Sequence, residues 1–286
     1  MPLAGRLTVR EKPTGGNVAG SVKLTGEPID GKREFLLFFH GYNNSEAEAE
    51  NRFTTFAQNL EKLSPGTAFN IYGFYWPGDK GIKIISTIAY PAELAPAKDS
   101  AKRLFEFLKP LSGPGGTPVS VKMLGHSLGC RSILEILKRF AGTQSKLVFQ
   151  AISLMAAAVP VGKAEASGEF GSAIARVSKT HVLFSTRDRV LQLAFPLGET
   201  LAFDGFFPEA VGRHGHPSVW TRPEQTSLAH ADCWFSSESV SRVGSFLGAP
   251  IHAVPAANAV AEHITRSADD IPANSIAARN LAPVFR

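Results

Sequence analysis

The chain has 286 residues, of which 44% are hydrophobic, enough to bury a full core, and α/β folds of this size are commonly one domain. The net charge is only +5, and the basic residues are spread along the chain, so composition gives a weak indication of affinity for anionic surfaces and none of nucleic-acid binding. Residues 1–20 contain no apolar core of signal-peptide length, and no later run is long enough for a membrane span, so we expect a cytoplasmic protein without a membrane span.

The first predicted elements form an antiparallel edge. Residues 6–10 and 21–24 alternate apolar and polar side chains around a glycine-containing connection, which predicts a half-exposed hairpin. Residues 35–39 are continuously apolar, as in a strand covered on both faces, and they end in His40 and Gly41. We therefore expect an edge hairpin followed by a central parallel strand.

Helical and strand patterns then alternate. Asn44 or Ser45 can cap a helix that Pro65 and Gly66 stop. The alternation continues with a strand at 69–75, a helix at 97–108, a strand at 119–124, a helix at 133–140, and strands at 147–154 and 181–184. Crossovers of this length predict a mostly parallel, doubly wound α/β sheet with helices on both faces.

The predicted domain covers residues 1–249. Within it, 195–223 is rich in Gly, Pro and aromatic residues and does not follow the alternation, so we interpret it as a cap or a substrate-lining loop. Residues 250–286 are predicted to be a loosely packed tail.

Ser127 is the predicted nucleophile. It is the centre of a Gly-x-Ser-x-Gly motif, Gly125 to Gly129, with a strand directly before it and an amphipathic helix directly after it, as a strand-turn-helix nucleophile elbow requires. The glycines allow neighbouring backbone to approach a strained turn. The alternative is a glycine-bounded turn whose serine only caps the helix.

A serine hydroxyl needs a base and an acid that orients it, and in this fold both follow the nucleophile in the chain. Asp188 follows a predicted strand, at the sheet edge where α/β sites are built. Asp204 and Asp232 are the alternative acids. Asp188 could also have a purely structural role, as a loop aspartate paired with Arg187 or Arg189. His230 stands in a polar turn before an apolar-periodic segment that can hold it rigidly, whereas a surface histidine is the alternative reading.

Backbone N–H groups of Tyr42 and Leu128 are the predicted oxyanion donors, because one donor follows the nucleophile and the other follows the buried strand that ends in His40. Tyr75, Trp76 and Trp220 are candidates for substrate contacts by position alone, and core packing explains such aromatic residues equally well.

The chain has only two cysteines, Cys130 and Cys233, which we interpret as buried thiols, with a bridge between them as the alternative. The His, Cys and Asp residues do not form metal-ligand spacings, so no metal and no cofactor is expected.

Four segments resemble uncharacterised bacterial α/β-hydrolases of the esterase/lipase superfamily. They are His40-Gly41-Tyr42-Asn43, Trp76-Pro77, Gly125 to Gly129, and His230-Ala231-Asp232-Cys233-Trp234. The likeness covers about residues 34–247 and implies the α/β-hydrolase fold and the order Ser, Asp, His. The resemblance does not identify a substrate.

We therefore expect a serine hydrolase that cleaves a small carboxylic ester through an acyl-enzyme on Ser127, with no cofactor. A thioesterase, peptidase or acyltransferase can use the same three residues. A binding protein that keeps the scaffold without catalysis is the alternative from another class.

Overall fold

The computed structural model describes residues 2–67, 69–79, 91–202, 206–214 and 220–251. The chain divides into a compact unit that ends at Ile251 and a second unit over residues 252–286. The predicted tail falls almost entirely in that second unit, outside the described residues. The account below concerns the first unit.

A single eight-stranded sheet forms the centre of this unit, in the order β2-β1-β4-β3-β5-β6-β7-β8. The strands are β1 (Gly5–Arg10), β2 (Val18–Gly26), β3 (Glu34–Phe39), β4 (Ile71–Tyr75), β5 (Val119–His126), β6 (Leu147–Met155), β7 (Lys179–Phe184) and β8 (Arg222–Gln225). Among the strand pairs of the described residues, only β1–β2 is antiparallel, and it stands at one edge. The predicted fold class, including its antiparallel N-terminal edge, is confirmed.

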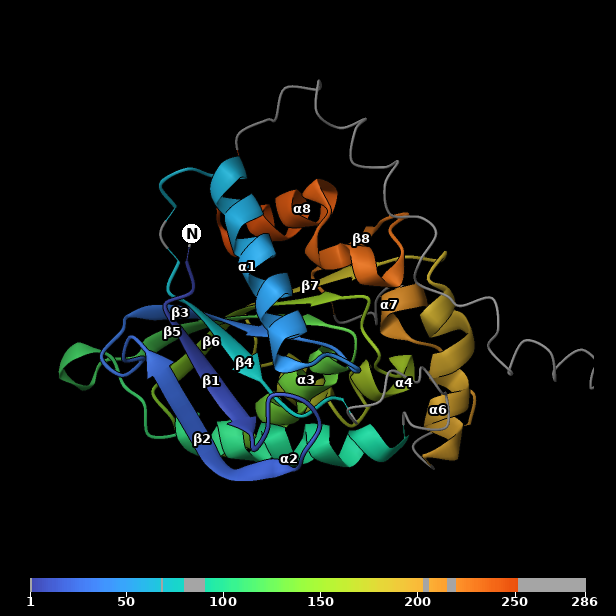
Figure 1. The fold of residues 1–286 in the computed structure, drawn as a ribbon, viewed down its shortest axis with the longest axis horizontal. Helices are drawn as coiled ribbons and strands as arrows, with labels where there is room; N and C mark the ends of the chain where they lie inside the picture. The colour runs from blue at the N-terminus through green and yellow to red at the C-terminus, as the bar shows by residue number, and fades with distance from the viewer. Residues whose placement is uncertain (1, 68, 80–90, 203–205, 215–219, 252–286) are drawn as a thin grey trace, which may run out of the picture. The chain divides into compact units, whose positions relative to one another are not determined.

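Helices cover both faces of the sheet. The α-helices are α1 (Glu46–Leu63), α2 (Pro91–Leu108), α3 (Leu128–Phe140), α4 (Val161–Ala164), α5 (Gly171–Ile174), α6 (Phe195–Leu201), α7 (Val211–His214) and α8 (Ser237–Leu247). Short 3₁₀ turns occur at η1 (Pro114–Gly116) and η3 (His230–Trp234), and a π-helical turn at η2 (Val190–Ala194). Helices α1 and α8 pack together on one face, and α2 and α3 on the other (Figure 1).

The predicted start of the first helix is settled in favour of Ser45. Its hydroxyl accepts the Glu48 N–H, and the Glu48 carboxylate accepts the Ser45 N–H, which is a complete capping box. The cap fixes where the chain leaves the loop after β3. That loop is therefore short and held at both ends.

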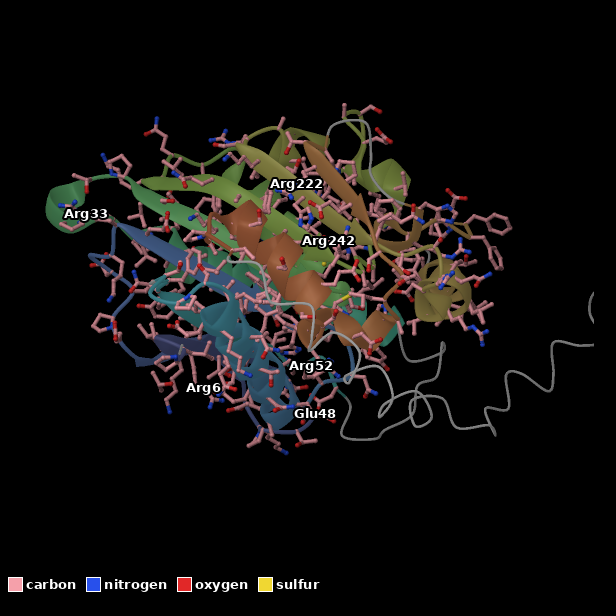
Figure 2. All side chains as sticks on the ribbon, turned by 90° about the horizontal axis from the view of Figure 1, so that it is seen from above. Arg6, Arg33, Glu48, Arg52, Arg222 and Arg242 are labelled. Carbon is pink, nitrogen blue, oxygen red and sulfur yellow. The ribbon has the colours of Figure 1, made fainter. Side chains whose placement is uncertain are left out.

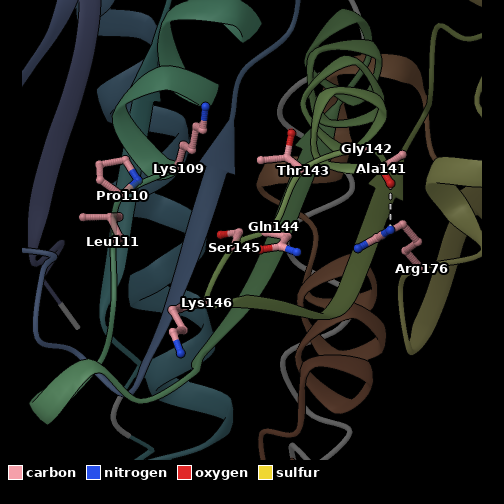
Figure 3. A pocket seen from close by; sticks show the side chains of 10 residues that line it. All are labelled: Lys109, Pro110, Leu111, Ala141, Gly142, Thr143, Gln144, Ser145, Lys146 and Arg176. Carbon is pink, nitrogen blue, oxygen red and sulfur yellow. Dashed lines mark hydrogen bonds between the residues drawn. The ribbon is translucent and has the colours of Figure 1, made fainter.

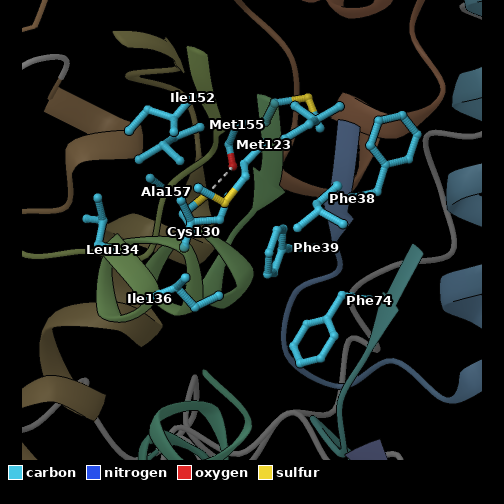
Figure 4. Packing of buried hydrophobic residues seen from close by; sticks show 14 of the residues in the cluster. Phe38, Phe39, Phe74, Met123, Cys130, Leu134, Ile136, Ile152, Met155 and Ala157 are labelled. Carbon is cyan, nitrogen blue, oxygen red and sulfur yellow. Dashed lines mark hydrogen bonds between the residues drawn. The ribbon is translucent and has the colours of Figure 1, made fainter. Parts of the chain in front are cut away.

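The core is rich in aromatic residues near the carboxyl ends of the central strands. Phe39 of β3 packs against Phe74 of β4 with ring centroids 5.4 Å apart, and Phe38 packs against Phe53 of α1; Figure 4 shows Cys130 of α3 beside Met155 of β6, to whose carbonyl its thiol is directed. Cys130 and Cys233 are both free thiols and both buried. The interpretation of two buried thiols agrees with the structure.

The segment at 195–223 has more regular structure than its composition suggested. It contains α6 and α7, and its end enters β8, a strand that the sequence analysis missed. Most of the side chains of β8 are exposed and it pairs only with β7, so it lacks the apolar run of a central strand. Whether this segment covers a substrate stays a prediction.

Ion pairs connect strand β8 to helix α8. Arg222 and Arg242 come close together in the view of Figure 2, and the Glu224 carboxylate contacts both of them. Arg242 also donates to the Gln225 carbonyl oxygen at 3.0 Å. The chain between Gln225 and α8 is thereby held at both ends, and it carries His230.

The N-terminal end of α3 comes very close to the end of β3. A Cβ atom on Gly129 would lie 2.4 Å from the His40 carbonyl oxygen and 2.7 Å from that of Phe39. Both are backbone atoms and cannot move without displacing a central strand. Glycine at this position therefore determines how deeply α3 seats under the sheet.

We predict that Gly129→Ala lowers the free energy of unfolding by about 3 kcal/mol, because the added methyl group overlaps backbone rather than a flexible side chain. Gly142→Ala is the matched control: it follows the same helix, and a Cβ there has no neighbouring atom within 4 Å. The control is expected to change stability by less than about 0.5 kcal/mol. Urea unfolding of both variants measures the difference, and equal stabilities would contradict the proposed seating.

Candidate functional site

Ser127 stands at a sharp turn between β5 and α3. Its backbone has φ 53° and ψ −124°, a left-handed conformation that costs a non-glycine residue about 1–3 kcal/mol. Backbone hydrogen bonds hold it there: Ser127 N–H donates to Met155 O at 3.0 Å, and Ser127 O accepts from Cys130 at 3.1 Å and Ala158 at 3.2 Å. The strain is thus maintained by three surrounding segments, and it projects the side chain away from the strand.

His230 links Ser127 to Asp188. Its Nδ1 lies 2.7 Å from Asp188 Oδ2, and its Nε2 lies 3.0 Å from Ser127 Oγ. A carboxylate oxygen accepts, so Nδ1 carries the proton and donates to Asp188. Nε2 is then the acceptor for the Ser127 hydroxyl. The structure brings together the three residues singled out from the sequence, although they are far apart in the chain.

The Asp188 carboxylate is fixed on both oxygens. It is buried, and its Oδ1 accepts the backbone N–H of Leu191 at 3.0 Å, in the π-helical turn η2. The remaining oxygen, Oδ2, faces His230. The structure thus places Asp188 against the imidazole, while Asp204, one of the alternatives, lies outside the described residues.

This arrangement can move a proton. An imidazole between a serine hydroxyl and a buried carboxylate can accept the hydroxyl proton, and the carboxylate stabilises the imidazolium that forms. The N-terminal end of α3 begins at Leu128, where the first N–H groups have no partner within the helix. Negative charge developing beside Ser127 would be favoured there.

The loop after β3 passes directly against Ser127. A Cβ atom on Gly41 would lie 2.8 Å from Ser127 Cβ and 3.0 Å from His126 Nδ1. The loop therefore needs glycine at this point. The Gly41–Tyr42 peptide follows this contact directly.

His126 is a residue whose role the sequence analysis missed. Its Nε2 donates to the backbone carbonyl of His230 at 2.7 Å, and the two rings lie 4.8 Å apart between centroids. Burial, and then the nearby His230, hold the pKa of His126 well below its usual value, so the ring is neutral. A histidine next to the predicted nucleophile was the available signal, but its hydrogen-bond partner is more than a hundred residues away.

The three aromatic residues proposed as substrate contacts are all buried. Tyr75 and Trp76 have no exposed surface, and Trp220 is 6% exposed. The Tyr75 hydroxyl donates to Glu50, and the Trp76 indole stacks on His40 with centroids 5.3 Å apart. The structure places Tyr75 and Trp76 in the core and not at a mouth, because both lie at the carboxyl end of β4 under the β3–α1 loop.

Two surface hollows do not include Ser127 among their lining residues. One of about 720 Å³ includes Lys109, Lys146 and Arg176 (Figure 3), where Arg176 donates to the Ala141 carbonyl. It stands at the amino end of β6, the opposite edge of the sheet from the turn that carries Ser127. A second, of about 420 Å³, is lined by the loops after β7 and β8 and by α8, beside the segments that hold Asp188 and His230.

Among the described residues, no cluster of three or more His, Cys, Asp or Glu side chains is arranged to hold a metal ion. Within the same residues, none of the helices is both long and apolar enough to cross a membrane.

We predict that His126→Phe lowers the free energy of unfolding by about 2 kcal/mol, because it leaves the half-buried His230 carbonyl without its donor. His126→Gln is expected to lose less, since its amide keeps an N–H near the position of Nε2. His214→Phe, at the surface, is the control and should stay within about 0.5 kcal/mol of the wild type. Urea unfolding at pH 7.5 distinguishes the three, and equal losses in the Phe and Gln variants would argue against the hydrogen bond.

The buried, neutral His126 ring should also make the free energy of unfolding depend on pH. The folded-state pKa of His126 is lowered, so the unfolded chain binds the extra proton first, and stability is lost as the pH falls below about 6.5. Each such group contributes a loss of up to about 1.4 kcal/mol per pH unit. We expect His126→Gln to lose less stability than the wild type between pH 7 and pH 5, measured by urea unfolding; an equal loss would contradict a buried neutral His126.

Comparisons with solved structures found several proteins similar to this chain. A carboxylesterase from Bacillus subtilis, CesB (YbfK), is 13% identical, with a TM-score of 0.43 over 87% of this chain and 94% of that one. TT1662 from Thermus thermophilus is 16% identical, with a TM-score of 0.43 over 80% and 92%. The lin2722 gene product of Listeria innocua is 12% identical, with a TM-score of 0.41 over 76% and 94%.

Likenesses this low say nothing about the substrate. None of the curated proteins compared with the chain matches it in sequence. The model of one family matches residues 25–201, more than half of the chain. The chain therefore belongs to the family described as alpha/beta hydrolases of unknown function (DUF900).

Proposed function

We propose that the protein is a serine hydrolase that cleaves carboxylic esters through an acyl-enzyme on Ser127. The observation that carries the proposal is the unbroken pair of hydrogen bonds from Asp188 through His230 to Ser127, of 2.7 and 3.0 Å. Membership of an α/β-hydrolase family supports it at the level of the fold.

In the proposed reaction, Ser127 Oγ attacks the ester carbonyl carbon while His230 Nε2 takes the hydroxyl proton. The tetrahedral oxyanion is stabilised by the N–H groups of Tyr42 and Leu128. Collapse breaks the bond to the alcohol, which leaves with the proton from His230. Water then attacks the acyl-enzyme with His230 as base again, and the acid is released from Ser127.

Asp188 has a positioning and electrostatic role in this sequence. It keeps the Nδ1 proton of His230 in place, so that Nε2 is always the nitrogen that faces Ser127. The backbone N–H of Leu191 on its other oxygen prevents the carboxylate from rotating away. The base is therefore available without a rearrangement.

The experiment compares wild type with Ser127→Ala on a short p-nitrophenyl ester and with a fluorophosphonate probe. We expect the variant to lose at least about 1,000-fold in kcat and all stoichiometric labelling. Ser132→Ala is the matched control, since Ser132 is a buried serine on α3, five residues after Ser127, whose hydroxyl has no hydrogen-bond partner among the described residues. It should label and hydrolyse like the wild type.

Two results would overturn the proposal. A wild type that neither labels nor turns over the ester would favour the scaffold as a binding protein. Transfer of the acyl group to an added alcohol in preference to water would instead indicate an acyltransferase that uses the same serine.

A further inference from the structure

We infer that His40 and Asn44 are positioning residues that fix the Gly41–Tyr42 peptide, so that the Tyr42 N–H faces the oxyanion formed at Ser127. The inference rests on the proposed function and extends it to residues outside the Ser, His and Asp set. Four contacts of the loop after β3 carry it.

The proton on His40 can occupy only one ring nitrogen. The backbone N–H of Trp76 points at His40 Nε2 at 3.2 Å, so Nε2 is an acceptor without a proton. Nδ1 therefore carries the proton, and it donates to the Gly41 carbonyl oxygen at 2.9 Å. A single neutral tautomer satisfies both contacts.

Asn44 supplies a second donor to the same carbonyl. Its Nδ2 lies 3.1 Å from the Gly41 oxygen and 2.8 Å from the Tyr42 oxygen. The Asn44 side chain is buried. The backbone of Asn44 is also held, because Arg10 donates to its carbonyl at 3.2 Å. The Gly41 carbonyl is thus held from two directions.

Holding that carbonyl also determines the direction of the next N–H. In a trans peptide, the C=O of Gly41 and the N–H of Tyr42 point in opposite directions. The Tyr42 N–H is therefore turned away from His40 and Asn44, while Gly41 lies so near Ser127 that a Cβ on it would be 2.8 Å from Ser127 Cβ. A donor fixed before the reaction needs no reorganisation when charge develops, which is what makes such donors effective.

Trp76 clamps the His40 ring in place. The indole stacks on the imidazole at an interplanar angle of 6°, and Trp76 Nε1 donates to the His40 carbonyl at 3.0 Å. Arg10 donates to the Trp76 carbonyl at 2.7 Å as well as to Asn44, so one buried cation joins both loops, and Asp79 neutralises it. These contacts explain why Trp76 is buried: it holds the His40 ring and backbone in position.

His40 should keep this tautomer over the whole working range of pH. Burial lowers the pKa of His40 to about 3, so the ring is uncharged from mildly acidic to basic conditions. It can orient the peptide but does not act as a base.

The kinetic test uses His40→Phe, which keeps an aromatic ring against Trp76 and removes the donor. We expect kcat for the p-nitrophenyl ester to fall by about 10- to 100-fold with KM changed less than threefold, because a mis-set oxyanion donor affects the transition state more than substrate binding. His40→Asn, whose amide keeps an N–H near the position of Nδ1, should recover at least half of that loss on a logarithmic scale. Asn44→Ala should show the same split between kcat and KM.

The matched control is Asn70→Ala. Asn70 Nδ2 also donates to a backbone carbonyl, that of Glu34 at 3.0 Å, but at the amino end of β3. Its kcat should stay within twofold of the wild type. The pH at which kcat/KM is half-maximal should be the same in wild type, His40→Phe and Asn44→Ala, since His230 remains the base.

A measurement without catalysis tests the tautomer directly. In the spectrum of ¹⁵N-histidine-labelled protein, the resonance missing from His40→Asn identifies His40, and we expect Nδ1 to carry the proton with no titration from pH 5 to pH 9. Protonation at Nε2 would overturn the inference whatever the activity.

The outcomes separate the inference from the proposed function. A hydrolysing wild type with unchanged kcat in both His40→Phe and Asn44→Ala would overturn the inference alone, as would a shifted pH profile in either. A wild type that does not label or hydrolyse would overturn the proposed function and, with it, the catalytic part of the inference.

Discussion

The close approach of two backbone turns is the constraint on which the rest of the site depends. The loop after β3 and the turn after β5 touch at Gly41 and Gly129, where a side chain of any size would overlap backbone or Ser127. The contact leaves no room for a side chain at either glycine, and it lies directly beside Ser127, which holds a left-handed conformation. The strain at Ser127 is stored in this contact and in the backbone hydrogen bonds around it.

Around that contact, histidines take two different roles. His230 lies between a hydroxyl and a carboxylate and is placed to exchange a proton. His40 and His126 are buried, neutral rings that each donate one N–H to a backbone carbonyl of a site loop. An imidazole suits this second role because it is flat, packs like an aromatic residue and still offers a directed donor. The positions of the loops are thus fixed by polar contacts inside an otherwise apolar core.

The sequence predicted the fold well where patterns were local. The apolar run of β3, the helix start at Asn44 or Ser45 and the strand-turn-helix around Ser127 each depend on residues that are neighbours in the chain. Strand β8 was missed because its side chains are mostly exposed and polar, so pairing with β7 alone defines it. The positions of Trp76 and His126 could not be predicted from the sequence either. Their partners, His40 and the His230 carbonyl, are distant in sequence, and only the folded chain brings them together.

Arg10 places an early segment of the chain inside this arrangement. It belongs to β1, yet it donates to the carbonyls of both Asn44 and Trp76, while the loop with His230 is supplied by one of the last described elements. During synthesis the ribosome releases Ser127 long before His230, so the serine emerges on a nascent chain that still lacks the histidine to which its hydroxyl is hydrogen-bonded in the folded protein. The hydrogen-bonded arrangement of Ser127, His230 and Asp188 can therefore form only when nearly the whole first compact unit has been made, and a product that ends before His230 would lack it.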